Sequence, residues 1–390
     1  MKFFATCARG TEGALRKELS GLRLHGVKGE RGGVAFEATT LEAGMRACLH
    51  SRTAMRVLLE LARFPAPDAT ALYDGARTVE WDAWLTARTT LAVDASVQSE
   101  TLTHSGFAAL KVKDAVVDVL REKLGARPDV DPKDPDVRIV LHLARDEATL
   151  SLDLAGEPLH KRGYRVSLGP APLKETLAAS VLLLGGANPE LPFVDPMAGS
   201  GTLAIEQAQR ARRIAPGQDR AFGFQRWPPY RGKLQSVFDR LRAEARAAAL
   251  PRPPAPILAR DFHPKAVEAL RRNVAAAGLE ADITIEQGDA RRLDLKGTPG
   301  TIATNPPYGE RLMSDPASKG RSGGRTDTET LKLRGFYRGL AEMFDRQHGW
   351  TALLLAGNPF LAEAMSGKAE VDHRLWNGPL EIHLLRYRIP

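Results

Sequence analysis

The chain contains very little cysteine. Cys7 and Cys48 are its only two cysteines, and they form no Cys-x-x-Cys pair. This scarcity argues against a disulfide framework and against a zinc site, so we predict no metal ion and a reducing, cytoplasmic compartment. Long apolar runs are also missing: none approaches the length of a membrane span, and the N-terminal one is too short for a signal peptide. We therefore expect a soluble protein without membrane contact.

Acidic side chains are outnumbered by basic ones. The sequence has 55 Lys and Arg against 47 Asp and Glu, a net charge of +8. Much of the excess lies in one basic window, residues 207–252, where three acids stand against eleven bases: Arg210, Arg212, Arg213, Arg220, Arg226, Arg231, Lys233, Arg240, Arg242, Arg246 and Arg252. Because neutralised phosphates release condensed counterions, such a window favours a polyanionic partner.

Proline-containing segments divide the chain. Pro65-Ala66-Pro67 and Gly169-Pro170-Ala171-Pro172 separate domains that we predict at residues 1–64, 65–168 and 169–390. In the first domain, strands and helices alternate in the order typical of a small ferredoxin-like unit.

The second domain carries the patterns of another small α+β unit. Residues 137–144 and 149–154 predict a β-hairpin. Residues 107–124 predict a helix whose core-facing side chains are Leu110, Val117, Leu120 and Leu124.

The third domain is predicted to be α/β. From Lys174 onward, helices alternate with short apolar runs, which is typical of a parallel sheet. We expect strands at residues 193–195, 257–261, 283–286, 301–304 and 351–356, then an antiparallel hairpin from residues 373–376 and 381–387. The basic window interrupts this domain as an insert at about residues 214–252. Residues 314–325, rich in Gly, Ser and basic side chains, predict a mobile loop that we extend to residue 335.

The sequence Val194-Asp195-Pro196-Met197-Ala198-Gly199-Ser200-Gly201-Thr202 predicts a buried strand that enters a glycine turn and then a helix. In such folds, cofactors bind in the crevice at the carboxyl ends of the strands. Gly199 and Gly201 would let the backbone approach a ligand, and Asp195 could bond to it. The turn lacks the Gly-x-Gly-x-x-Gly spacing and the lysine of phosphate-binding loops, which disfavours a nicotinamide cofactor or ATP. A tight strand-to-helix turn without a ligand is the alternative.

Two further acids support a ligand. Asp261 ends the next predicted strand, before a helix that starts at Pro264, and could bond both hydroxyls of a ribose. Asp289 ends the third strand and could accept a bond from an adenine amine. The separation of Asp195 and Asp261 exceeds the usual spacing of roughly 20 residues, and the inserted basic window explains the excess. These acids predict a site for an adenosine without a phosphate cradle.

Asn305-Pro306-Pro307-Tyr308 follows the fourth predicted strand and opens into the same crevice. The side-chain carbonyl of Asn305 and the backbone carbonyl of Pro306 could accept both N–H bonds of an exocyclic base amine, which favours a more tetrahedral nitrogen. The prolines stiffen the loop, and Tyr308 could stack on the base. A Pro-Pro turn with an incidental aromatic is the alternative. Together the two motifs predict methyl transfer from S-adenosylmethionine to a nucleobase nitrogen, with catalysis largely by positioning.

Other short motifs occur along the chain: Phe4 to Gly10, Lys111 to Ala115, Leu159 to Arg165, Ala171 to Leu177, Asn305 to Leu312 and Asn377 to Leu380. With the two motifs above, they resemble the family of THUMP-containing ribosomal RNA guanine-N2 methyltransferases over nearly the full length. The resemblance implies a ferredoxin-like domain, a THUMP domain that grips RNA, and a class I, Rossmann-like, seven-stranded methyltransferase domain. It also implies methylation of the N2 amine of a guanine in 23S rRNA.

We predict a cofactor site from the motifs and the resemblance together, with Thr176 near the amino-acid end of S-adenosylmethionine. Its residues are Thr176, Asp195, Pro196, Met197, Ala198, Gly199, Gly201, Thr202, Asp261, Phe262, Asp289, Ala290 and Asn305. The catalytic residues are Asn305, Pro306, Pro307 and Tyr308. The candidate RNA contacts are Lys111, Lys113, Lys161, Arg162, Arg226, Arg231 and Lys233.

Some features depart from the family pattern. His263 stands where relatives often have a second acid, and Ala198 where they often have cysteine. Some relatives are fused to a second methyltransferase domain, and we expect an unfused form here. The aromatics of the basic window, Phe222, Phe224, Trp227 and Tyr230, either stack on RNA or pack the insert onto its domain.

Other functions stay open at this point. Guanine-N2 methylation of tRNA is the nearest alternative to methylation of 23S rRNA or of its assembly intermediate. Adenine-N6 methylation of DNA is another, since those enzymes share the Asn-Pro-Pro-Tyr motif, although no DNA-reading helix-turn-helix is evident. An RNA chaperone with relict catalytic motifs is a third. The sequence indicates no obligate protein partner.

Overall fold

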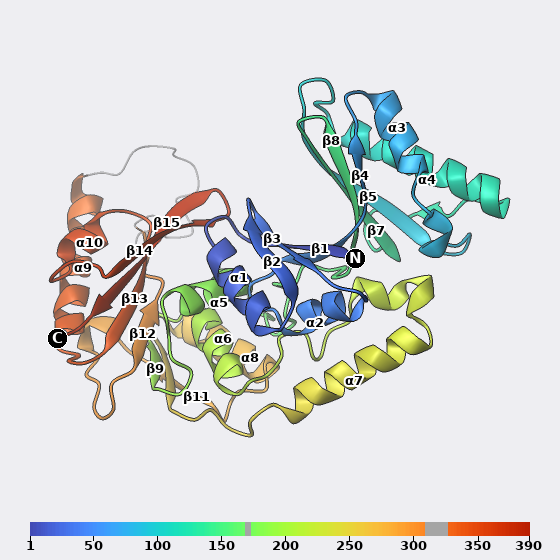
Figure 1. Cartoon of the computed structure of the whole chain (residues 1–390). Coiled ribbons are helices and arrows are strands. Elements are labelled where there is room, and N and C mark those ends of the chain that lie inside the picture. Colours follow the sequence, from blue (N-terminus) through green and yellow to red (C-terminus); the bar gives the residue numbers. More distant parts are fainter. Residues whose placement is uncertain (168–172, 309–326) are drawn as a thin grey trace. The chain divides into compact units, whose positions relative to one another are not determined.

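The computed structural model describes residues 1–167, 173–308 and 327–390 (Figure 1). The proline-containing boundary at 169–172 and the loop predicted at 314–325 lie outside the described residues. The chain forms two compact units. Unit 1 contains Met1–Cys7, Leu15–Lys161 and Ala215–Ala247, and unit 2 contains Ala8–Ala14, Arg162–Ile214 and Ala248–Pro390.

Unit 1 is built on one eight-stranded sheet with the order β2-β3-β1-β4-β8-β7-β5-β6. Its strands are β1 (Lys2–Thr6), β2 (His25–Glu30), β3 (Gly33–Glu37), β4 (Arg56–Pro65), β5 (Thr90–Gln98), β6 (Asp129–Val130), β7 (Val137–Ala144) and β8 (Glu147–Asp153). Strand β4 pairs with β1 on one side and β8 on the other. The two small α+β regions expected from the sequence therefore share a continuous sheet, and the predicted hairpin is confirmed as β7 and β8.

The helices of the N-terminal region are α1 (Glu12–Gly21), α2 (Glu42–His50), α3 (Ala69–Arg77), the short 3₁₀ helix η1 (Trp81–Ala83) and α4 (Ser105–Leu124). The predicted core face of α4 was largely wrong. Leu110 and Leu124 are 56% and 44% exposed, and Val117 is half-buried, so of the four only Leu120 is in the core. The buried face instead carries Ala108, Val112, Ala115, Val116, Val119 and Leu120. Small side chains at these positions let α4 lie close to the sheet, so its leucines do not mark the buried side.

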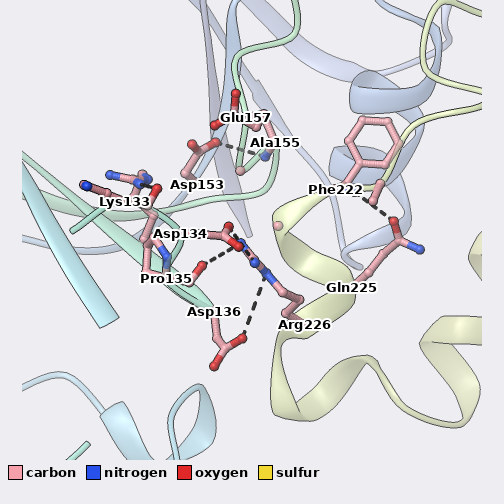
Figure 2. A pocket seen from close by; sticks show the side chains of 14 residues that line it. Lys133, Asp134, Pro135, Asp136, Asp153, Ala155, Glu157, Phe222, Gln225 and Arg226 are labelled. Atoms are coloured by element: carbon pink, nitrogen blue, oxygen red, sulfur yellow. Dashed lines mark hydrogen bonds and ion pairs between the residues drawn. The ribbon is translucent and has the colours of Figure 1, made fainter. Parts of the chain in front are cut away.

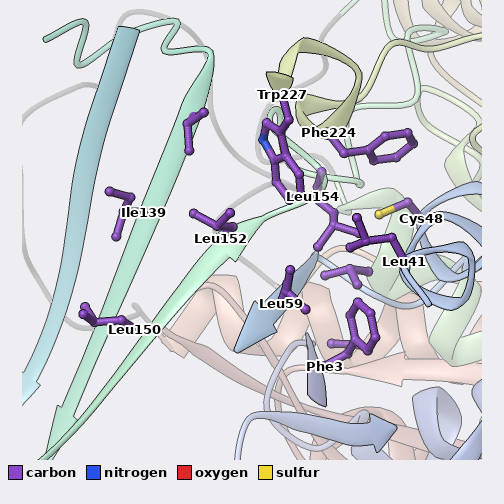
Figure 3. Packing of buried hydrophobic residues seen from close by; sticks show 14 of the residues in the cluster. Phe3, Leu41, Cys48, Leu59, Ile139, Leu150, Leu152, Leu154, Phe224 and Trp227 are labelled. Atoms are coloured by element: carbon purple, nitrogen blue, oxygen red, sulfur yellow. The ribbon is translucent and has the colours of Figure 1, made fainter. Parts of the chain in front are cut away.

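The basic insert packs into the core of unit 1. Phe222, Phe224, Trp227 and Tyr230 are all buried there, and Trp227 meets Trp84 edge-on at 5.6 Å between ring centroids. Figure 3 shows Phe224 and Trp227 among the core side chains near Leu154. These four aromatics are therefore packing residues, and the idea that they stack on RNA was wrong. The insert also contains η2 (Gly223–Arg226), η3 (Pro228–Tyr230) and α7 (Lys233–Ala247).

Unit 2 is an α/β unit with a seven-stranded sheet in the order β11-β10-β9-β12-β13-β15-β14. Its strands are β9 (Phe193–Asp195), β10 (Ile257–Asp261), β11 (Ile283–Gln287), β12 (Thr301–Thr304), β13 (Thr351–Ala356), β14 (Val371–Asn377) and β15 (Leu380–Arg388). The first five run parallel, and β15 is antiparallel to both its neighbours. The predicted strands and the final hairpin are confirmed to within a few residues.

Helices α5 (Glu175–Leu184), α6 (Thr202–Ala211), α8 (Pro264–Ala276), α9 (Asp327–Asp345) and α10 (Phe360–Ala364), with the 3₁₀ helix η4 (Ala290–Arg292), complete unit 2. Residues 327–335, which we assigned to a long loop, begin α9 instead. Phe193 and Val194 of β9 belong to two different apolar clusters. Both faces of the sheet are thus covered, as parallel sheets require. None of the described helices is long and apolar enough to cross a membrane.

Candidate active site

The strand order of unit 2 reverses between β9 and β12. The chain leaves β9 toward β10 and β11 on one side, then returns to place β12 on the other. Ligands of open α/β sheets bind where the strand order reverses in this way. Asp195 ends β9 and Asn305 follows β12, and the two strands are paired. The two predicted motifs therefore lie on adjacent strands at this switch point.

The glycine turn after β9 adopts the conformation that its sequence suggests. Gly199 and Gly201 have φ angles of +55° and +90°, in the left-handed region that favours glycine. A Cβ on Gly201 would come within 2.3 Å of the Leu270 side chain, so this glycine is needed for packing. A Cβ on Gly199 would meet no described atom within 4 Å. No described residue therefore fills the space next to Gly199.

Asp261 holds this turn in place. Its Oδ2 accepts the backbone N–H of Gly199 at 2.9 Å, and its Oδ1 accepts that of His263 at 2.9 Å. The following helix starts at Pro264, as the sequence predicted. Each carboxylate oxygen can accept more than one hydrogen bond, so Asp261 retains acceptor capacity for ribose hydroxyls.

Asp195 is buried beneath the turn. The backbone N–H of Met197 donates to its Oδ1 at 3.2 Å. Burial raises the pKa of the Asp195 carboxyl to about 7, and the negative charge of Asp261 acts in the same direction, against the side chain of Thr304 and the Met197 N–H. A cation nearby would favour its ionised form.

Asp289 is engaged by a residue that the sequence analysis did not select. Its carboxylate accepts the backbone N–H of Arg291 at 2.9 Å and the guanidinium Nη2 at 2.6 Å. The hydrogen bonds from Arg291 lower the pKa of Asp289, which keeps its carboxylate ionised. Neighbouring Ala290 is buried, whereas Phe262, after Asp261, is 63% exposed and offers an apolar face.

The start of α5 contains an unsatisfied group. Thr176 is buried, and its hydroxyl has no hydrogen-bond partner among the residues that the structure describes. Leaving a buried hydroxyl unpaired costs about 1–3 kcal/mol, so such groups usually have a partner. A polar ligand group would supply one, which fits the predicted position near the amino-acid end of the cofactor.

Arg165 connects this helix start to the glycine turn, and sequence reasoning missed it. Its Nε donates to Glu175 at 2.7 Å, and its Nη2 donates to the hydroxyl of Thr202 at 3.0 Å. Its Nη1 reaches the hydroxyl of Ser200 at 3.3 Å. The available signal was the motif Leu159 to Arg165, in which we had selected other basic residues.

The loop Asn305 to Tyr308 is held by its own side chains and by two neighbours. The Tyr308 hydroxyl donates to Asn305 Oδ1. The Tyr337 hydroxyl donates to the carbonyl of Pro307 at 2.8 Å, and Asn358 Nδ2 donates to that of Tyr308 at 3.3 Å. The predicted catalytic residues are therefore brought together at the end of β12.

The predicted RNA contacts differ in how available their charges are. Arg162 is only 3% exposed and pairs with buried Glu206, so we remove it from the proposed RNA-binding set. Arg226 donates to Asp134 at 2.7 Å and to the carbonyl of Pro135 at 2.6 Å, on the wall of a cavity of about 250 Å³ (Figure 2). Its charge is thus already matched within unit 1.

The other predicted RNA contacts also differ in whether their charges are paired within the protein. Lys161 pairs with Glu157, and Lys113 pairs with Asp114. Lys111 lies over the ring of Phe107, 5.7 Å from its centroid. Most arginines of the basic window bind carboxylates or backbone carbonyls, namely Arg210, Arg212, Arg213, Arg220, Arg226, Arg240, Arg242, Arg246 and Arg252. The side chains of Arg231 and Lys233 form no such contact with any described residue, and both are exposed.

The parts of the site define a class of protein. A seven-stranded sheet with one antiparallel strand, a glycine turn after its first strand and acids at the ends of the next two is a class I, Rossmann-like methyltransferase domain. Residues 162–386 match the family described as the RMKL-like methyltransferase domain, and the chain belongs to this family. Residues 66–153 match the THUMP domain, and residues 2–58 match the RlmL ferredoxin-like domain. The expected fold class is thereby confirmed.

Individual relatives agree with this assignment. A ribosomal RNA large subunit methyltransferase K/L of Syntrophotalea carbinolica is 42% identical over 406 residues, which cover 100% of this chain and 54% of the relative. The chain thus spans about half the length of the curated relatives it matches. Among solved structures, SMU.472 in complex with SAH is 29% identical with a TM-score of 0.87, covering 100% of this chain and 98% of that one. A protein from Listeria monocytogenes, titled a predicted N6-adenine-specific DNA methylase, is also 29% identical, with a TM-score of 0.85 and coverages of 100% and 96%.

Proposed function

We propose that the chain methylates the exocyclic N2 amine of a guanine in 23S rRNA with S-adenosylmethionine. The observation that carries this proposal is the adjacency of β9 and β12, which end in the glycine turn and in the Asn305 loop. A cofactor turn beside two candidate acceptors for an amine suits transfer to a base nitrogen. The name of the Syntrophotalea carbinolica relative supports ribosomal RNA as the substrate.

The residues suit the cofactor. Thr176 has a buried hydroxyl in need of a partner, and Gly199 borders open space. We assign the amino-acid end to Thr176, the ribose to Asp261, and the adenine to Asp289, Ala290 and Phe262, while Asp195, Pro196, Met197, Ala198, Gly201 and Thr202 build the turn around it. S-adenosylmethionine supplies an electrophilic methyl group, so the protein mainly has to position the amine. The SAH bound to SMU.472 supports this choice of cofactor.

In the proposed mechanism, Asn305 Oδ1 and the carbonyl of Pro306 accept the two amine hydrogens. This draws the nitrogen lone pair out of conjugation and toward the methyl donor. The Tyr308 hydroxyl occupies one acceptor position of Asn305 Oδ1, and a carbonyl oxygen has a second. A paired guanine must first be unstacked, and Tyr308 would then stack on it.

RNA is the proposed partner, with the THUMP region of unit 1 contributing to binding. Among the predicted RNA contacts, Lys111, Arg231 and Lys233 form no ion pair with an acid in the described part of the chain. A naked 23S rRNA or its assembly intermediate, in the cytoplasm, is the substrate that we propose, with no obligate protein partner.

Single-turnover transfer of a labelled methyl group to 23S rRNA, tRNA and DNA in parallel tests the proposal, with digestion and mass analysis of the product nucleoside. We expect N2-methylguanosine in 23S rRNA only. Methylated tRNA would move the substrate to the alternative class of RNA. N6-methyladenine in DNA would favour the activity named for the Listeria monocytogenes protein, which is the second candidate because of its structural similarity.

A further inference from the structure

The backbone carbonyls of the Asn305 loop fall into two groups. Those of Pro307 and Tyr308 accept hydrogen bonds from Tyr337 and Asn358. The carbonyl of Pro306 accepts none from any residue that the structure describes. The Pro306 carbonyl, which the mechanism assigns to the base amine, is therefore followed by two carbonyls that are fixed by hydrogen bonds from Tyr337 and Asn358.

The side chains of Tyr337 and Asn358 are hydrogen-bonded to each other, and the direction of each bond is fixed. Asn358 Oδ1 accepts the backbone N–H of Phe360 at 3.1 Å. Because that N–H can only donate, the Asn358 amide is oriented with Nδ2 toward Tyr308 and the Tyr337 hydroxyl, the latter at 3.2 Å. The Tyr337 hydroxyl accepts from Asn358 and donates to Pro307.

Tyr337 comes from a helix of unit 2, and Asn358 comes from the short segment between β13 and α10. Tyr337 is buried and lies on α9. Asn358 follows β13, the strand that pairs with β12, which itself leads into the loop. A supporting group on a packed helix, such as Tyr337, holds a reacting loop more accurately than a group on another loop can.

Gly357 completes the support. A Cβ at this position would lie 2.7 Å from Cγ of Tyr308 and 2.9 Å from both Cδ atoms, so the tyrosine ring lies directly on the glycine backbone. The backbone of Gly357 thus covers one side of the Tyr308 ring. Any larger residue at position 357 would displace the ring proposed to stack on the base.

We propose that Tyr337 and Asn358 are positioning residues for methyl transfer, and that Gly357 provides the seat for Tyr308. By holding the peptide groups after Pro306, they set the direction of the Pro306 carbonyl and the place of the Tyr308 ring. Neither side chain is assigned to a reacting atom. The inference rests on the proposed role of the Asn305 loop in the reaction.

Tyr337→Phe removes the hydroxyl alone and is the principal test. Since misplacement by about 1 Å can cost on the order of 100-fold, we expect single-turnover transfer to fall by roughly 10- to 100-fold. Affinity for S-adenosylmethionine and the KM for RNA should stay within about 2-fold. Tyr387→Phe is the matched control: Tyr387 is a buried tyrosine on β15 that belongs to a different apolar cluster from Tyr308, and its replacement should leave the rate unchanged.

Asn358→Ala and the double variant with Tyr337→Phe test whether the two residues act together. Groups in one network are non-additive, so the double variant should be little slower than the slower single variant. Gly357→Ala should lower the rate by displacing Tyr308. If the rate reduction in the double variant equals the product of the two single reductions, the two residues act separately, and the proposed network is overturned.

Hydrogen exchange of the peptide containing residues 305–308 provides a measurement that needs no RNA. Tyr337→Phe should accelerate exchange there, and Tyr387→Phe should not. Unchanged exchange, unchanged transfer, or loss of cofactor affinity in parallel with the rate would each overturn the inference. A wild-type chain that methylates no RNA would refute the proposed function instead, and the exchange result would still decide whether Tyr337 holds the loop.

Discussion

The carboxylate of Asp261 accepts a hydrogen bond from the backbone N–H of Gly199, with 2.9 Å between Oδ2 and the nitrogen. The acid at the end of β10 thus fixes the turn that follows β9. The residue that we propose as the ribose acceptor also shapes the neighbouring part of the cofactor site.

Asp261→Ala should therefore weaken binding of S-adenosylmethionine. Loss of hydrogen bonds to a charged acceptor should cost about 2–3 kcal/mol, and the released Gly199 turn adds to the effect. Calorimetry measures the affinity. His263→Ala is the control, because His263 contacts Asp261 through its backbone, and it should bind normally. Normal affinity in Asp261→Ala would assign the ribose to another residue.

Arg165→Met should reduce both stability and cofactor affinity. It leaves the buried carboxylate of Glu175 without its cation, and breaking a buried pair typically costs about 3–5 kcal/mol. Denaturant unfolding and calorimetry measure the two effects. Adding Glu175→Gln should recover much of the stability but not the affinity, because Ser200 and Thr202 still lack their donor. Recovery of both would mean that Arg165 does not act through the glycine turn.

Binding of S-adenosylmethionine should weaken as the pH falls below about 7. The pKa of Asp195 in the ligand-free protein is raised to about 7 by burial. A cationic ligand favours the ionised carboxylate and lowers this pKa, so below about pH 7 binding must also remove a proton. The affinity should level off above that pH. Asp195→Asn should abolish this part of the dependence, and an identical pH profile in the variant would exclude Asp195 as its source.

Replacing Arg231 and Lys233 together with Ala should flatten the salt dependence of RNA binding. If each contacts one phosphate, the slope of log affinity against log salt should fall by roughly 2. Arg226→Ala is the control, since Arg226 is bound to Asp134 and Pro135, and should leave the slope unchanged. Filter binding over a salt series gives the slopes. An unchanged slope in the double variant would mean that Arg231 and Lys233 face solvent and do not contact RNA phosphates.

Asn305→Ala should abolish most methyl transfer while cofactor affinity stays nearly normal. Loss of one preorganised acceptor typically costs about 100- to 1,000-fold in rate. Because Asn305 also accepts from the Tyr308 hydroxyl, Tyr308→Phe serves as the comparison and should be much less impaired. Single-turnover transfer measures both. A rate within a few-fold of wild type would remove Asn305 from the mechanism.

Strands β9 and β10 could be predicted from the sequence because each is a short, largely apolar run that ends in Asp, and β13 because it is almost wholly apolar. Strand β2 could not, since its sequence His25–Glu30 is mostly polar and exposed. Helix α3 was also missed. For α4, the leucines suggested the wrong face, because close packing selected alanine and valine instead.

Within the site, the acids at strand ends and the Asn305 loop followed from sequence position alone. Arg165, Tyr337 and Asn358 did not, because the groups that they bind lie on other elements. Arg291 was missed although it follows the selected Asp289 by two residues. The basic window illustrates the same limit. Its composition suggested an RNA surface, whereas most of its arginines bind acids and carbonyls of the protein itself.

The discontinuity of unit 1 has a consequence for its synthesis. Residues 215–247, whose Phe222, Phe224 and Trp227 fill its core, leave the ribosome only after the segment Arg162–Ile214 of unit 2. The 86 residues between Lys161 and Ala247 (247 − 161) require roughly 4–17 s at about 5–20 residues per second. During that interval the nascent N-terminal domains expose an incomplete apolar core. A fragment that begins near residue 170 would contain these aromatics without the core residues that bury them. The two halves of this chain are therefore not independent folding units.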